Sequence, residues 1–111
     1  MPRLNYVELP VRDLGVVRAF YSDAFGWTFT DFGPSYSSTT TGDTDLGLQA
    51  DAADWTAQLL PVIEVEDLEA AQARIEAAGG AITLAIFSFP GGRRFHFRDP
   101  AGHELAAMQP A

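Results

Sequence analysis

Apolar and polar residues alternate over residues 4–11, and this two-residue period predicts a half-buried strand. One face of that strand carries Val7, Leu9 and Val11, and the other carries Tyr6, Glu8 and Pro10. After Asp13, a residue type that caps helices, the period lengthens. An apolar stripe at helical spacing then predicts a helix packed on a core, with Gly26 as its stop and the stripe formed by Val17, Phe20, Tyr21 and Ala24.

Three short strands are predicted after this helix, near residues 27–32, 35–41 and 44–50. The dipeptides Gly33-Pro34 and Gly42-Asp43 separate them. The segment 51–58 then joins the first half of the chain to the second.

The second half repeats the first. Val11-Arg12-Asp13-Leu14 returns as Val65-Glu66-Asp67-Leu68, and the interval between these motifs equals that from Gly26 to Gly80. The repeat predicts a strand over 59–65 and a helix with Leu68, Ala71, Ile75 and Ala78 on its apolar stripe. Further strands are predicted near 81–87, 93–98 and 104–109, with a type I turn at Asp99-Pro100-Ala101-Gly102.

This pattern predicts an α+β fold of two tandem βαβββ modules within a single domain over residues 1–111. Repeat 1 covers about 1–55 and repeat 2 about 56–111. A repeated unit of this size cannot bury its own apolar face, so the two copies are expected to pack together.

Composition narrows the partners. The net charge of −8 disfavours a nucleic-acid or anionic-membrane partner, since both need clustered positive charge. No apolar run approaches the roughly 18 residues that span a bilayer. Because residues 1–5 also lack a signal-peptide pattern, a cytoplasmic location is expected.

Missing residue types narrow the chemistry. Without cysteine there is no thiol nucleophile or thiolate metal site, and without lysine there is no Schiff-base chemistry. His96 and His103 are the side chains that ordinarily titrate near neutral pH. Acid–base chemistry must therefore use these histidines, a tyrosine or a carboxylate with a raised pKa.

Several motifs, taken in order, resemble the vicinal oxygen chelate superfamily, which includes glyoxalase I, bleomycin-resistance proteins and extradiol dioxygenases. They are the Val-x-Asp-Leu motifs, Phe20-Tyr21, Phe25-Gly26-Trp27 and Phe97-Arg98-Asp99-Pro100-Ala101-Gly102-His103. The approach through Pro90-Gly91-Gly92 resembles small proteins related to lactoylglutathione lyase. The resemblance implies curled mixed sheets that form a groove, with the active site in that groove.

Family enzymes hold a divalent metal with side chains from equivalent strands. Carried over to this chain, the ligand positions fall at Tyr6, Leu60 and Ala106, with a fourth near Gly47 and Gln49 next on that face. Leucine and alanine have no donor atoms, so the usual metal ligands are absent and no cofactor is predicted. A shifted set would have to come from Glu8, Glu64, Glu104 and His96.

The strand 93–98 supplies the clearest groove candidates. Its alternation predicts that Phe95 and Phe97 pack on a helix, while Arg94, His96 and Arg98 line the groove. Arginine suits carboxylate, phosphate or phenolate groups, although salt bridges to glutamate are an alternative role here. The predicted ligand-binding residues are Tyr6, Gln49, Leu60, Val62, Arg94, Arg98, Ala106 and Met108, and the candidate catalytic residues are Glu8 and His96.

Three functions follow as hypotheses. The first is binding of a small organic molecule without the usual metal. The second is a metal-independent lyase or isomerase in which Glu8 or His96 is the base and Arg94 stabilises negative charge. The third is a divalent-metal lyase or dioxygenase with shifted ligands. A homodimer is expected in each case, because Trp27, Trp55 and eight phenylalanines are more than a small core readily hides.

Overall fold

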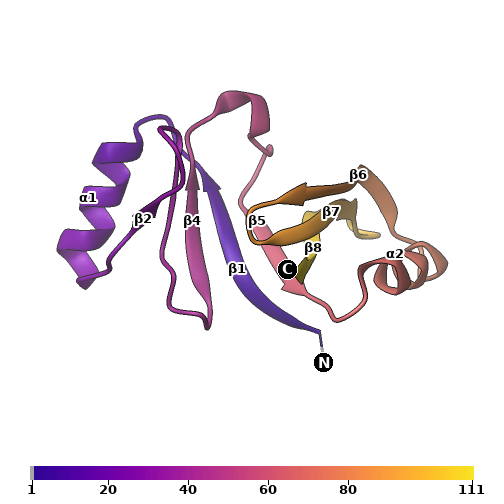
Figure 1. Ribbon diagram of the computed structural model, residues 1–111. Helices are drawn as coiled ribbons and strands as arrows, with labels where there is room; N and C mark the ends of the chain where they lie inside the picture. The colour runs from indigo at the N-terminus through magenta and orange to yellow at the C-terminus, as the bar shows by residue number, and fades with distance from the viewer. Residues whose placement is uncertain (1) are drawn as a thin grey trace. The chain divides into compact units, whose positions relative to one another are not determined.

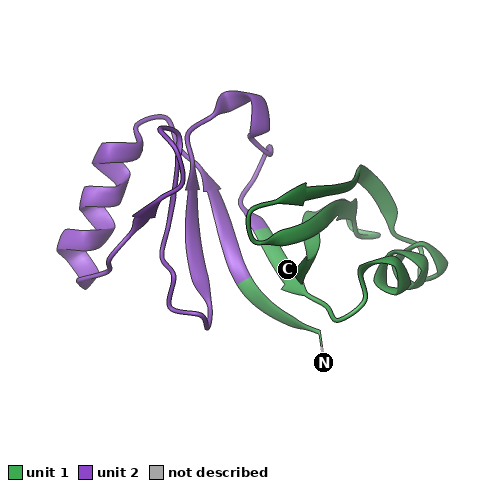
Figure 2. Ribbon diagram, in the orientation of Figure 1, with its two compact units in different colours: residues 1–5, 61–111 green, residues 6–60 purple. Residues whose placement is uncertain are grey.

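The computed structural model describes residues 2–111 and contains two α-helices and eight strands in that range (Figure 1). The chain divides into two compact units, coloured separately in Figure 2. Unit 2 comprises residues 6–60, and unit 1 comprises residues 61–111 with the chain before residue 6. Strand pairs are both parallel and antiparallel, so the predicted α+β class is confirmed. Between residues 2 and 111 no helix is long and apolar enough to cross a membrane.

Unit 2 pairs its strands in the order β2-β3-β4-β1. The β1–β4 pair is parallel, and the other two pairs are antiparallel. The elements are β1 (Arg3–Pro10, which begins before the unit), α1 (Leu14–Phe25), β2 (Thr30–Asp31), β3 (Tyr36–Ser38), β4 (Asp45–Gln49) and the 3-10 helix η1 (Ala52–Asp54).

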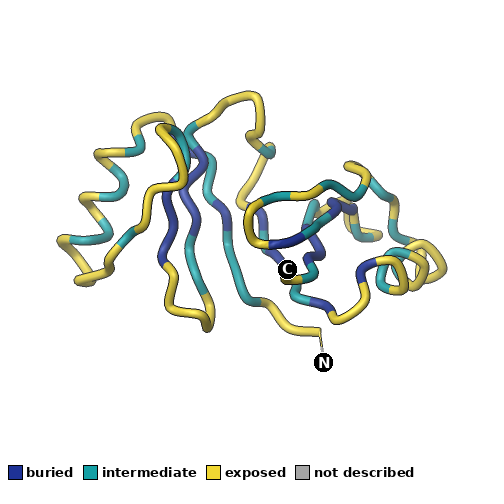
Figure 3. The backbone as a smooth tube through the Cα atoms, viewed as in Figure 1, coloured by how far each residue is buried: buried dark blue, intermediate teal, exposed yellow. Residues whose placement is uncertain are grey.

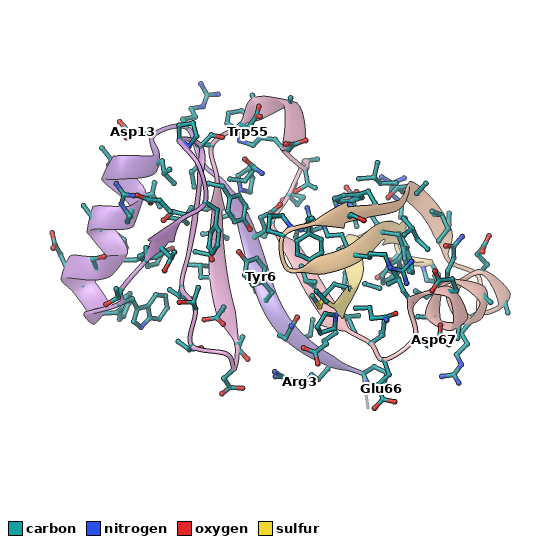
Figure 4. The ribbon with its side chains drawn as sticks, viewed as in Figure 1. Arg3, Tyr6, Asp13, Trp55, Glu66 and Asp67 are labelled. Atoms are coloured by element: carbon teal, nitrogen blue, oxygen red, sulfur yellow. The ribbon has the colours of Figure 1, made fainter. Side chains whose placement is uncertain are left out.

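The ends of α1 are as predicted. The Asp13 carboxylate accepts a hydrogen bond from the backbone N–H of Val16 (3.1 Å), and Figure 4 labels Asp13 at the start of the helix. Gly26 is left-handed (φ 71°), and its N–H donates to the carbonyl of Ser22. Glycine adopts this conformation at little cost, so it ends the helix here.

The predicted apolar stripe of α1 is wrong in part. Phe20 is 59% exposed, Ala24 is also exposed, and no residue of α1 is buried, as the tube in Figure 3 shows. Leu14, Val17 and Tyr21 are its half-buried apolar residues. The physical reason is the length of the neighbouring strands: β2 has two residues and β3 has three, so the sheet gives the helix little surface to cover.

Unit 1 pairs its strands in the order β5-β8-β7-β6, with β5 and β8 parallel and the other pairs antiparallel. Its sheet is larger than that of unit 2 because its last three strands are long. The elements are β5 (Leu60–Glu64, whose first residue ends unit 2), α2 (Leu68–Ala77), β6 (Ala81–Phe89), β7 (Gly92–Arg98) and β8 (Glu104–Pro110).

The core of unit 1 lies between α2 and one face of this sheet. Asp67 caps α2 as predicted, by accepting from the N–H of Ala70 (3.0 Å). The buried cluster consists of Val65, Leu68, Phe95, Phe97 and Ala107, with Ile63, Ala71 and Ile75 packed against it. The predicted orientation of Phe95 and Phe97 toward a helix is therefore confirmed. Ala78, the last residue of the predicted stripe, is exposed at the end of α2.

The turn between β7 and β8 forms as predicted. The N–H of Gly102 donates to the carbonyl of Asp99 (2.9 Å), which closes the turn. The Asp99 carboxylate accepts from the N–H groups of His103 and Ala101, and these bonds, His103 first, lower the pKa of Asp99. His103 is exposed, as expected.

Candidate functional site

In each unit, the sheet face opposite the helix collects the buried polar side chains; we call it the helix-free face. In unit 1, alternation along β7 sends Phe95 toward α2 and therefore sends Arg94 and His96 to the helix-free face. The register places Arg94 opposite Met108 and His96 opposite Ala106 on β8. The predicted groove side of β7 is thus the helix-free face of unit 1.

His96 is a buried imidazole held by a carboxylate. Its side chain is 4% exposed, and its Nδ1 lies 3.0 Å from Oε2 of Glu104. The same carboxylate oxygen accepts from the hydroxyl of Thr83 on β6 (3.2 Å). A carboxylate on one ring nitrogen fixes the orientation of the imidazole and favours the tautomer with the proton on that nitrogen.

Arg94 lies against aromatic rings rather than in open solvent. Its Cζ is 5.1 Å from the ring centroid of Phe87 and 5.5 Å from that of Phe89, both on β6. The Phe87 ring is also 6.1 Å from the His96 ring. A register shift in β6 between Leu84 and Phe87 brings Phe87 opposite Arg94. The result is a cation over aromatic faces beside a buried imidazole.

Asn5 adds a polar group to this face. Its Nδ2 donates to Oε1 of Glu64 (3.1 Å) and lies 3.8 Å from the sulfur of Met108. Its Oδ1 is buried and has no hydrogen-bond partner among the described residues. A buried acceptor without a partner costs free energy, so a bound donor at this point would be stabilising.

In unit 2, the helix-free face carries a buried carboxylate joined to two phenols. Glu8 is 3% exposed, and its Oε1 accepts from the hydroxyl of Tyr36 (2.9 Å). The hydroxyls of Tyr36 and Tyr6 are 2.5 Å apart. Figure 4 labels Tyr6 on β1. Two strands and a neighbouring hairpin therefore bring three ionisable groups into one hydrogen-bonded chain, which we call the Tyr6–Tyr36–Glu8 chain.

A glycine makes room for this chain. Gly47 on β4 lies opposite Glu8 on β1 and opposite Ser38 on β3. A Cβ atom at this position would lie 2.0 Å from the Tyr6 hydroxyl oxygen and 2.4 Å from that of Tyr36. Any larger residue would displace the hydroxyls, so the short contact between the phenols depends on glycine here.

Tyr36 keeps its proton. Burial raises the pKa of the Tyr36 hydroxyl far above its ordinary value of 10.0, and the neighbouring Glu8 carboxylate raises it further. Tyr36 is therefore a hydrogen-bond donor toward Glu8 throughout the physiological range.

The other predicted ligand-binding residues divide by burial. Leu60, Val62, Ala106 and Met108 are at most 9% exposed, whereas Arg98 is exposed at the end of β7. The carboxamide oxygen of Gln49 accepts from the N–H of Asp51 (2.9 Å), which orders the start of the following loop. The indole N–H of Trp55 donates to the Gln49 carbonyl (2.8 Å), so Trp55 fixes the same loop.

Sequence reasoning missed Tyr36, Asn5, Phe87 and Phe89. For Tyr36 a signal existed, since the predicted strand 35–41 alternates and puts Tyr36 and Ser38 on one face. For Phe87 no local signal exists, because its position depends on an irregularity in β6. Asn5 gives no pattern of its own beside the neighbouring Tyr6.

A strand, a helix and three strands in each half, with polar groups buried on the helix-free faces, define a class of small α+β proteins. Residues 3–107 match the family model of the Glyoxalase/Bleomycin resistance protein/Dioxygenase superfamily. The chain belongs to this superfamily, which confirms the resemblance seen in the sequence. Comparison with curated proteins gives no match.

Solved structures share the fold. A hypothetical protein from Bacillus halodurans C-125 has a TM-score of 0.81 at 11% identity, covering 99% of this chain and 95% of that one. Methylmalonyl-CoA epimerase from Mycobacterium tuberculosis has a TM-score of 0.76 at 18% identity, covering 97% and 87%. A superfamily member from Vibrio splendidus 12B01 has a TM-score of 0.68 at 19% identity over the full length of both chains. Identities this low establish the fold alone.

The metal that the superfamily resemblance implies does not fit the residues at the expected positions. The Tyr6 phenol is hydrogen-bonded to Tyr36, and Leu60 and Ala106 offer no donor atom. The shifted set of Glu8, Glu64, Glu104 and His96 does not assemble either. In residues 2–111, no three histidine, aspartate or glutamate side chains form a group that could hold a metal ion.

Gly47→Ala should destabilise the protein. The new methyl group must push both phenol oxygens aside, and overpacking of this kind costs about 1–3 kcal/mol. Gly15→Ala is the matched control, because its Cβ would meet nothing closer than 3.7 Å within a helix. Urea unfolding measures both variants. A Gly47→Ala protein as stable as the wild type would show that the phenols do not pack as described.

Stability should fall at alkaline pH because of Tyr36. A folded-state pKa raised above the ordinary 10.0 means that the stabilisation is complete below that pH and is lost as the pH rises above it. The chain has no lysine or cysteine, so tyrosines dominate titration in this range. Urea unfolding at a series of pH values should show a shallower alkaline decline for Tyr36→Phe than for the wild type or Tyr21→Phe. Equal slopes in all three proteins would refute the assignment.

Proposed function

We propose that this protein binds a small organic molecule with an anionic group on the helix-free face of unit 1, without the metal of its superfamily. The observation that carries the proposal is Arg94, which lies over Phe87 and Phe89 beside the buried His96. A cation on an aromatic surface is suited to a planar organic anion, because guanidinium recognises carboxylate or phosphate and the rings contact apolar atoms.

The neighbouring groups support the same function. The unpartnered Oδ1 of Asn5 can accept a hydrogen bond from a ligand. Val62 and Ala106 lie opposite each other on β5 and β8 and give a small apolar surface on the same face. Sites for small molecules usually combine an apolar lining with a few polar groups that fix orientation.

A second candidate is a metal-independent lyase or isomerase. Its support is the pairing of His96 with Glu104 at 3.0 Å, the arrangement in which a carboxylate orients a general base. Glu8 is the alternative base, and Arg94 would stabilise the negative charge that develops on the substrate. The substrate of either reaction stays open.

The expected homodimer also stays a prediction, and the exposed aromatic residues of unit 2 support it. Phe25 and Trp27 are 60% and 43% exposed, and their rings stack 5.3 Å apart. Tyr21 stacks on Trp27 at 5.8 Å. A contiguous aromatic surface of this kind is typical of protein interfaces. The cytoplasmic location and the groove between the repeats likewise remain predictions from the sequence.

Arg94→Gln should weaken the binding of simple aromatic anions. Benzoate and phenyl phosphate are suitable probes, with benzyl alcohol as the neutral analogue, and isothermal titration calorimetry is the measurement. Loss of a charged hydrogen-bond donor should reduce affinity about tenfold or more.

Arg93→Gln is the control for this experiment. Arg93 belongs to the same strand but pairs with Glu69 of α2 through two bonds of 2.7 and 3.0 Å, which hold the pKa of Glu69 at about 2. Its removal should leave affinity unchanged. Equal losses for both variants, or no binding by the wild type, would count against the proposed site.

Metal content tests the other half of the proposal. Protein incubated with Mg, Mn, Fe, Co, Ni or Zn and then desalted should retain well under one equivalent of each ion by elemental mass spectrometry. The reason is the lack of donor atoms at Leu60 and Ala106. Near-stoichiometric retention of one ion would restore a divalent-metal lyase or dioxygenase as the leading function.

A further inference from the structure

We infer that the Tyr6–Tyr36–Glu8 chain is a proton relay of fixed direction, which takes a proton from a weakly acidic ligand at Tyr6 and delivers it to Glu8. The inference rests on the second candidate function, which makes Glu8 a base. It deepens that function by giving a buried carboxylate a path to a ligand, and it names weak O–H acids, such as phenols, as the ligand class.

The direction follows from counting protons. The Glu8 carboxylate can only accept, and the Tyr36 hydroxyl donates its single proton to it. In the 2.5 Å contact between the phenols, Tyr36 must therefore accept, so Tyr6 is the donor. The proton of Tyr6 is then also directed along the chain, toward Glu8. A ligand at Tyr6 accordingly meets an oxygen that accepts a hydrogen bond.

Burial explains why a relay is needed. Glu8 is 3% exposed, whereas Tyr6 is half-buried and stands one hydrogen bond further from the carboxylate than Tyr36. Transfer through the two hydroxyls reaches Glu8 without bringing the ligand to it. The raised pKa of Tyr36 helps, because the middle member then always holds the proton that it must pass on.

The transfer balances in protons and charge. The ligand O–H bond breaks and its proton bonds to the Tyr6 oxygen, while the Tyr6 proton moves to the Tyr36 oxygen. The Tyr36 proton moves to Oε1 of Glu8, which becomes a neutral acid, and the ligand keeps the electron pair as an anion. All the hydrogen bonds then point the other way, so Tyr6 donates to the anion that it has created.

Internal transfer has a signature that a purely structural hydrogen-bond network lacks. When the proton goes to Glu8, the bound complex neither gains nor loses protons, so the fraction of ionised ligand is independent of pH. When the proton goes to the buffer, the anion-to-acid ratio changes about tenfold per pH unit.

The probes are nitrophenols of graded acidity, whose anions absorb visible light. Each is bound at saturating protein, and anion absorbance is followed at pH values below the pKa of the free probe. For the wild type and for Tyr21→Phe, the anion-to-acid ratio should change less than about twofold per pH unit. For Glu8→Gln and Tyr36→Phe it should follow pH as in free solution, while the probe still binds.

Three results would overturn the relay. The first is the same pH slope in Glu8→Gln as in the wild type. The second is a wild-type slope in Tyr36→Phe, which would mean that Glu8 is reached without Tyr36. The third is no binding of any nitrophenol to the wild type, which would mean that Tyr6 does not meet such ligands. These results leave the benzoate experiment at Arg94 untouched, so failure of the relay and of the proposed function are distinguishable.

A measurement on the wild type alone removes any dependence on how the variants fold. Infrared difference spectra on probe binding should show the C=O stretch of a newly protonated carboxylic acid, with an isotope shift in D2O, together with the anion of the probe. Anion formation without that band would show that the proton does not reach Glu8.

Discussion

The free-energy cost of taking an ionisable group out of water governs the helix-free faces of both units. An unpaired buried charge would cost several kcal/mol, about as much as a small domain can spare. Glu8 and His96 are each less than 5% exposed, and each has a specific partner, Tyr36 for the first and Glu104 for the second. Those partners fix the strand registers around them. Gly47 follows from the same requirement, because the two phenols fit only where no side chain stands between them.

The two units meet the requirement for a core to different extents. In unit 1, long strands and α2 bury a continuous apolar cluster around Phe95, so the opposite face can hold polar groups on a rigid support. In unit 2, β2 and β3 are short and α1 leaves Phe20 and Phe25 largely exposed. Hydrogen bonds through Tyr36 and Trp55 therefore contribute more of the order in that unit. Its exposed aromatic surface is also where a further contact would add most stability.

The sequence predicts local features well because local residues determine them. The Asp13 and Asp67 caps and the turn at Asp99 need only neighbours a few positions away. The faces of β7 follow from simple alternation. By contrast, the exposure of Phe20 depends on the length of strands elsewhere in the unit, and the contact of Phe87 with Arg94 depends on an irregularity in β6. Tyr36 could be placed on a face but not paired with Glu8, since that pairing joins strands separated by α1.

The chemistry of the two faces suits a protein that works without the metal of its superfamily. A bound divalent ion stabilises an oxyanion by its positive charge and favours loss of a proton from the group that it binds. In this chain those two tasks fall to different side chains. Arg94 supplies a positive charge that no accessible pH removes, and Glu8 supplies a proton acceptor. Arginine has no acceptor and a carboxylate has no donor, so the two clusters select opposite partners. Neither cluster is explained by stability alone, because apolar residues of similar volume would bury these positions at lower cost. Their retention on the helix-free faces therefore argues for binding chemistry there.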